Sequence, residues 1–195
     1  MLSQADNEYA TRTNPGTPMG EFIRRFWMPA LLTEELPEPN CPPIRLKLLG
    51  ENLVAFRDSL GRPATDRYPC AERGGVIWMY MGPPELMAGV PELEWTLVAP
   101  EQRYLSKRLQ QSNYLQAIEG GIDSSHISFL HSTFNMIDRP LSSTGGVIPQ
   151  FVAEDKHPRF EVLSTRYGHL VAARRDAGTD AYYWRVSQYL VPLFR

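Results

Sequence analysis

Cysteine and histidine, the side chains that commonly bind transition metals, are scarce in this sequence. Its 195 residues include two cysteines, Cys41 and Cys70, and four histidines, the first of which is His126. Two cysteines give no basis for a disulfide framework, so the sequence predicts a cytoplasmic chain with free thiols.

The sequence also lacks an excess of basic residues and any long hydrophobic run. The net charge is -2 and the pI about 6.1, which argues against a nucleic-acid partner. No apolar stretch approaches the roughly 20 residues of a membrane helix, and the first residues do not resemble a signal peptide. With 43% hydrophobic and 22% charged residues, the composition is that of a globular chain of one domain or two small ones.

The N-terminal part predicts one short helix followed by a small sheet. Thr17 is a suitable N-cap and Pro18 a suitable first helical residue, and the helix over "MGEFIRRFW" should end at Pro29. After the proline-rich linker "LPEPNCPP", the alternating run "IRLKLLGENLVAFRDSLGRP" predicts two strands joined at residues 50–52. Together with the buried strand expected in "GGVIWMYMG", residues 40–82 should form an antiparallel sheet.

The C-terminal part predicts a helix between strands. "RYLSKRLQ" should be a strand, and "SNYLQAIEGGIDSSHISFLHS" a helix with Ser112 as its N-cap. The runs "RFEVLST", "GHLVAARR" and "YYWRVSQYLVP" predict three further strands. The last of these is expected at a sheet edge, where exposed Tyr183, Val186 and Tyr189 would favour self-association.

The motif with the clearest chemical meaning is D-x-x-H-x-x-x-x-H, formed by Asp123, His126 and His131. Two imidazoles and one carboxylate can hold Fe(II) and leave positions open for oxygen chemistry. On spacing alone, a structural role is favoured, with His126 in the core and His131 at a helix end, because a strong metal prediction needs more ligands. Glu119 could border such a pocket, although a solvated or helix-pairing carboxylate is the more typical role.

The histidine spacing also makes a geometric prediction. On a regular helix, residues five apart point about 140° away from each other. If both imidazoles bind one metal, the helix must therefore bulge or break between Ile127 and Leu130.

The segment "NYLQAIEGGIDSSHISFLH" strongly resembles the iron site of the large (alpha) subunits of Rieske-type non-haem iron aromatic ring-hydroxylating oxygenases. The runs "NPGTPMGEFIRRFW" and "ERGGVIWMYMGPPE" extend the resemblance to the phthalate 4,5-dioxygenase and phenoxybenzoate dioxygenase branch. The resemblance implies that His126 and His131 bind a mononuclear iron. It also implies that Asp123 links this iron to the Rieske cluster of a neighbouring subunit.

The same resemblance implies a reaction and its partners. These are hydroxylation of an aromatic substrate with O₂, electrons from a ferredoxin or flavin reductase, and a homo-oligomer of the trimer type.

The sequence departs from this family at the [2Fe–2S] cluster. A Rieske cluster needs two cysteines and two histidines, in the family as Cys-x-His and Cys-x-x-His pairs. Here Cys41 precedes Pro42-Pro43, and Cys70 precedes Ala71-Glu72-Arg73, with only "ATDR" between the framing strands. The downstream aspartate that is the family's third iron ligand has no counterpart either. We therefore expect family membership with activity lost or strongly impaired.

The resulting prediction is an α+β fold in three parts. Residues 1–39 would be a helical segment, and residues 40–83 a remnant antiparallel Rieske-type β domain without its cluster loops. Residues 84–195 would be a partial helix-grip catalytic domain. Two other functions stay open: a non-catalytic ligand-binding module, and an assembly or regulatory relative that oligomerises with an intact oxygenase.

Overall fold

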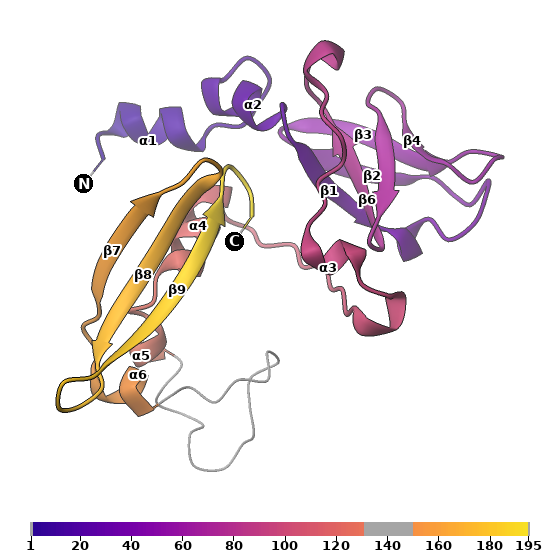
Figure 1. Ribbon diagram of the computed structural model, residues 1–195. Coiled ribbons are helices and arrows are strands. Elements are labelled where there is room, and N and C mark those ends of the chain that lie inside the picture. The colour runs from indigo at the N-terminus through magenta and orange to yellow at the C-terminus, as the bar shows by residue number, and fades with distance from the viewer. Residues whose placement is uncertain (1, 131–149, 195) are drawn as a thin grey trace. The chain divides into compact units, whose positions relative to one another are not determined.

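The computed structural model describes residues 2–130 and 150–194 (Figure 1). Within them, short helices accompany three antiparallel sheets of three strands each, which confirms the predicted α+β class. The chain divides into two compact units, Met1–Gln111 and Ser112–Arg195. None of the helices in the described ranges is long and apolar enough to cross a membrane.

The first unit begins with helices α1 (Gln4–Thr11) and α2 (Pro18–Ile23). The hydroxyl of Thr17 accepts a hydrogen bond from the amide of Gly20, so the predicted N-cap of α2 is confirmed. The helix was predicted to run on to Pro29, but strand β1 (Trp27–Leu32) begins first. Proline is tolerated there because β1 is an edge strand whose register shifts between Pro29 and Leu31.

Two sheets replace the single sheet expected in residues 40–82. The first has the order β1-β6-β5 and the second β2-β3-β4. Strand β6 is buried along its whole length, as its apolar sequence predicted. The bounds are β2 (Ile44–Leu48), β3 (Glu51–Arg57), β4 (Pro63–Thr65), β5 (Cys70–Arg73) and β6 (Val76–Tyr80).

Short helical turns and extended chain complete this unit. The turns are η1 (Thr33–Glu35), η2 (Pro84–Leu86), α3 (Glu94–Leu97) and η3 (Pro100–Gln102). The strand predicted in "RYLSKRLQ" is wrong, since residues 103–110 have no regular structure. Tyr104 and Leu109 are about nine-tenths exposed, so these side chains pack against no sheet in the described residues.

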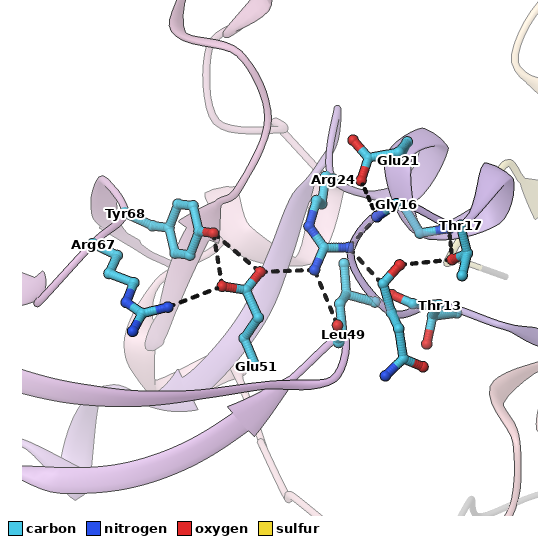
Figure 2. A network of polar contacts seen from close by, with 11 residues as sticks. Thr13, Gly16, Thr17, Glu21, Arg24, Leu49, Glu51, Arg67 and Tyr68 are labelled. Atoms are coloured by element: carbon cyan, nitrogen blue, oxygen red, sulfur yellow. Dashed lines mark hydrogen bonds and ion pairs between the residues drawn. The ribbon is translucent and has the colours of Figure 1, made fainter.

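A buried arginine ties the start of the chain to the β2–β3 hairpin (Figure 2). The guanidinium of Arg24 donates to the carbonyls of Thr13, Gly20 and Leu49, and to Glu51 Oε1 at 2.8 Å. Leu49 and Gly50 have positive φ, so the tight turn lies at these residues and not at the predicted 50–52. Arg24 thereby holds the carbonyl of a residue in the unusual left-handed conformation.

The second unit packs helices against a meander of three strands (Figure 1). The three predicted strands are confirmed, whereas the helix N-cap is Asn113, whose side chain accepts from the amide of Gln116, and not Ser112. The elements are α4 (Tyr114–Ile122), α5 (Ile127–Leu130), α6 (Gln150–Glu154), β7 (Arg159–Ser164), β8 (Gly168–Asp176) and β9 (Tyr182–Leu190).

The two faces of this sheet differ in burial. At β8 and β9, the face with Ala173 and Arg175 is covered, and Tyr183 stacks there on Phe151 of α6, whereas every residue of β7 is exposed. On the opposite face, Leu163, Trp184 and Val186 are 63%, 42% and 57% exposed. Because side chains alternate along a strand, the predicted exposed trio is split. Tyr183 and Tyr189 are half-buried on the covered face, and only Val186 is exposed.

Self-association through this exposed face is the expected result in solution. In the described residues, β9 forms a ladder only with β8, apart from a single bridge between Leu190 at its end and Phe194, and its neighbouring apolar side chains lie open. Sedimentation velocity should show oligomers whose fraction falls in Val186→Lys, while Ser187→Lys, on the other face, should change it less. A monomer at all concentrations would contradict this.

Candidate metal centre

The predicted site segment is a break between two helices. Helix α4 ends at Asp123, whose ψ of 120° is extended, and α5 starts at Ile127. The break therefore covers residues 123–126, and the predicted break at 127–130 is wrong, since these four residues are helical. Aspartate explains the position, because its carboxylate competes for backbone amides and ends helices.

The carboxylate of Asp123 organises the turn that follows it. Its Oδ1 accepts from the amide of Ser125 at 2.7 Å, and its Oδ2 accepts from the amide of His126 at 3.1 Å. Burial acts to raise the pKa of the Asp123 carboxyl, but the hydrogen bonds from Ser125 and His126 together outweigh it and lower the pKa. The carboxylate is thus ionised at neutral pH.

The ionised carboxylate sets the tautomer of His126. The imidazole Nδ1 lies 3.1 Å from Asp123 Oδ2. An ionised carboxylate only accepts hydrogen bonds, so Nδ1 carries a proton, and in the neutral imidazole the lone pair is on Nε2. Histidines that bind metals typically have this arrangement, with the second ring nitrogen donating to a carboxylate or carbonyl.

Of the other predicted site residues, His131 lies outside the described residues, and Glu119 is exposed on α4. Within residues 2–130 and 150–194, no three His, Cys, Asp or Glu side chains are grouped as a metal site would require. The part of the predicted site that the structure describes therefore consists of one histidine, His126, and the carboxylate that orients it, Asp123.

Sequence reasoning missed Arg175, the buried residue that contacts this turn. It donates to Ser124 and Ser128, on either side of His126. A signal was present, because Arg175 continues the apolar alternation of Val171 and Ala173 in a strand. A cation on a covered face requires buried partners.

The first unit does not fit a [2Fe–2S] cluster. Cys41 and Cys70 both pack against the hydrophobic core formed by Leu31, Leu36, Ala55 and Ile77. Burial raises the pKa of the Cys70 thiol to about 11, so it is protonated, whereas a cluster ligand is a thiolate. Between β4 and β5 the chain makes a tight turn, in which Thr65 Oγ1 accepts from the amide of Tyr68 at 2.9 Å.

The purified chain is therefore expected to be colourless, even after iron–sulfur reconstitution. The reason is that neither cysteine is accompanied by a histidine and the first histidine is His126. Visible absorption and electron paramagnetic resonance measure this directly. A red-brown protein with a Rieske-type signal would contradict it.

Comparison with known proteins gives the family. Residues 79–194 match the family model described as "LigXa C-terminal domain like". The oxygenase subunit of 3-chlorobenzoate-3,4-dioxygenase from Comamonas testosteroni is 32% identical over 255 positions, which cover all of this chain and 56% of the relative. The phthalate 4,5-dioxygenase oxygenase subunit from Pseudomonas putida is 28% identical, over 93% of this chain and 55% of the relative.

A third relative, the alpha subunit of phenoxybenzoate dioxygenase from Ectopseudomonas oleovorans, is 26% identical over 63% of this chain. The chain spans about half the length of the curated relatives it matches. The first alignment is also longer than this chain, so that relative carries segments without a counterpart here. The chain belongs to the LigXa C-terminal-like family and, with it, to the alpha subunits of the Rieske-type oxygenases.

Proposed function

We propose that this chain is an oxygenase-derived domain that binds a mononuclear iron through His126 and His131. One observation carries the proposal: Asp123 fixes the His126 imidazole with its proton on Nδ1, 3.1 Å from the carboxylate, so that Nε2 is the metal-binding nitrogen. The matched family and the names of the relatives support it. His131 enters through the resemblance of its segment.

Bound at this site, iron would supply activation of O₂ for hydroxylation of an aromatic substrate, with electrons from a reductase. The chain's own residues orient the ligand. Asp123 holds the Nδ1 proton, fixes the ring, and caps the turn through two backbone amides. By resemblance, Asp123 would also be the link to an electron donor on a neighbouring subunit. The first two relatives are named for 3-chlorobenzoate and phthalate, so an aromatic carboxylate is the proposed substrate class.

The missing cluster ligands favour a second function. With Cys41 and Cys70 packed in a core, this chain would rely on another chain's cluster for electrons. Without electrons from such a cluster, it would serve as a non-catalytic ligand-binding module, or as an assembly or regulatory relative that oligomerises with an intact oxygenase. We keep the proposed division into a helical segment (1–39), a Rieske-type remnant (40–83) and a partial helix-grip domain (84–195).

Metal titration tests the site. Two histidines without their carboxylate ligand should bind Fe(II), under anaerobic conditions, or Zn(II) only weakly. In calorimetric titrations, His126→Ala and His131→Ala should each abolish binding. His169→Ala is the matched control, because His169 stacks on Tyr189 in the sheet and should not affect the affinity. Unchanged affinity in His126→Ala would show that the site is assigned wrongly.

A further inference from the structure

Arg175 is a charged side chain deeply buried in the second unit. Only 1% of it is exposed, and it lies on the covered face of β8. Transfer of a cation into such surroundings is costly unless its donors are all bound. Burial accordingly lowers the pKa of Arg175, although arginine stays charged.

The contacts of Arg175 converge on the turn that carries His126. Nη1 donates to the hydroxyl of Ser124 at 3.0 Å, and Nη2 donates to the carbonyl of Ser124 at 2.6 Å and to the hydroxyl of Ser128 at 3.3 Å. Nε donates to the carbonyl of Asp155 at 3.0 Å. Three of these four bonds reach residues two positions before and two positions after His126.

These bonds provide hydrogen-bond donors to the backbone where the break between α4 and α5 leaves it without helical partners. Ser124 lies in the interruption between α4 and α5, so its carbonyl is satisfied by the guanidinium and not by a continuing helix. Ser128 belongs to α5, so one planar group grips both the turn and the following helix. Arginine suits this role because its donors have a fixed planar arrangement. Without that grip, α5 could rotate about its axis and carry His126 with it.

The base of the arginine is itself fixed. The Asp155 carboxylate accepts from the amide of Asp176 at 2.8 Å and from the amide of His157 at 3.0 Å. These bonds hold the end of β8 against the residues that follow α6. The end of β8 that carries Arg175 is therefore fixed, which limits the positions that the guanidinium can adopt.

We infer that Arg175 is the positioning residue of the metal centre: it fixes the turn at residues 123–126 and so aims the imidazole of His126. The inference rests on the proposed function, since it names the residue that orients one of the proposed ligands. A positioning role and a purely electrostatic role of Arg175 have opposite effects on metal affinity. A cation near a metal site opposes metal binding, so a purely electrostatic Arg175 would weaken affinity, whereas a positioning Arg175 strengthens it.

Co(II) is the probe, because its visible absorption reports ligand geometry as well as affinity. The full chain and its Arg175→Met and Arg175→Lys variants are titrated with Co(II). Arg175→Met should weaken binding by about tenfold or more, as loss of a residue that orients a ligand does, and should change the Co(II) spectrum. Arg175→Lys keeps the charge but loses the planar donor group, so it should recover little of the affinity.

Two further variants make the test specific. Arg174→Met is the matched control, because Arg174 lies on the opposite face over the ring of Tyr182, and its affinity and spectrum should equal those of the wild type. The double variant Ser124→Ala/Ser128→Ala removes both hydroxyl acceptors of Arg175 and leaves the arginine in place. The double variant should weaken Co(II) binding, so the test remains valid even if Arg175→Met does not fold. Circular dichroism will show whether each variant is folded.

The outcomes separate the two proposals. If the wild type does not bind Co(II), or His126→Ala binds it equally well, the proposed metal centre is wrong and the inference with it. If Co(II) binds through His126 but the folded arginine and serine variants bind with unchanged or higher affinity, the metal centre stands and the positioning role of Arg175 is overturned.

Discussion

Replacing Arg24 with methionine is expected to lower the free energy of unfolding of the first unit by about 3–5 kcal/mol, because one partner of a buried ion pair is removed. Arg24 is 5% exposed, and its loss removes the guanidinium donors to three backbone carbonyls and to Glu51, whose carboxylate then keeps only Tyr68 and Arg67 as side-chain partners. Urea unfolding followed by tryptophan fluorescence measures the change.

Arg25→Met is the matched control for this prediction. Arg25 is the exposed neighbour of Arg24, so its replacement should change the free energy of unfolding by less than about 0.5 kcal/mol. Equal losses in the two variants would show that the buried network contributes nothing specific.

The same network has a pH dependence with a definite sign. The hydrogen bond from Arg24, opposed by burial and joined by Tyr68, lowers the pKa of Glu51. A depressed carboxyl pKa contributes stability that is complete above its ordinary value of about 4.3 and is lost as the pH falls through the folded-state pKa. Glu51→Gln should remove this part of the acid sensitivity, which urea unfolding between pH 3 and pH 6 would reveal.

Replacing Gly168 with alanine should destabilise the second unit by at least about 2 kcal/mol, through backbone strain and overpacking. Gly168 begins β8 with φ +148°, and an added Cβ would overlap the carbonyl oxygen of Tyr189 in β9. Since Gly168 pairs with Leu190, the β8–β9 ladder should open from this end. Hydrogen exchange of the β9 amides would show the loss residue by residue.

Gly120→Ala provides the contrast within the same unit. Gly120 lies in α4, and nothing would approach an added Cβ within 4 Å. Alanine is favoured over glycine in a helix by about 1 kcal/mol, so this variant should be slightly more stable than the wild type. If Gly168→Ala were equally benign, the close approach of β8 and β9 would be wrong.

The elements that the sequence predicted correctly are those with a local cause. Thr17-Pro18 starts α2, and alternating apolar residues form the three strands of the second unit. The errors arise where distant partners decide. Strand β1 exists because β6 pairs with it, and "RYLSKRLQ" is irregular because none of the strands in residues 2–130 and 150–194 pairs with it.

In the candidate site, too, the contacts between residues near in sequence were predicted and those between distant residues were missed. The pairing of Asp123 with His126 follows from a spacing of three residues and was accessible from sequence. The break at 123–126 was placed one turn too late, because the helical-wheel argument ignored the capping power of Asp123. Arg175 was missed because its partners, Ser124 and Ser128, lie about 50 positions earlier in the chain and are polar residues without a motif.

The pairing of β1 with β6 also determines the order in which the chain can assemble during synthesis. The β2–β3–β4 meander and the β7–β8–β9 meander join strands that are neighbours in sequence, so each can form as soon as it emerges from the ribosome. Strand β1 instead waits until β6, which follows the whole first meander, has been made. During that interval the apolar Trp27, Met28 and Leu31, which are buried in the folded unit, have no sheet partner, so this stretch is the part of the first unit that becomes ordered last.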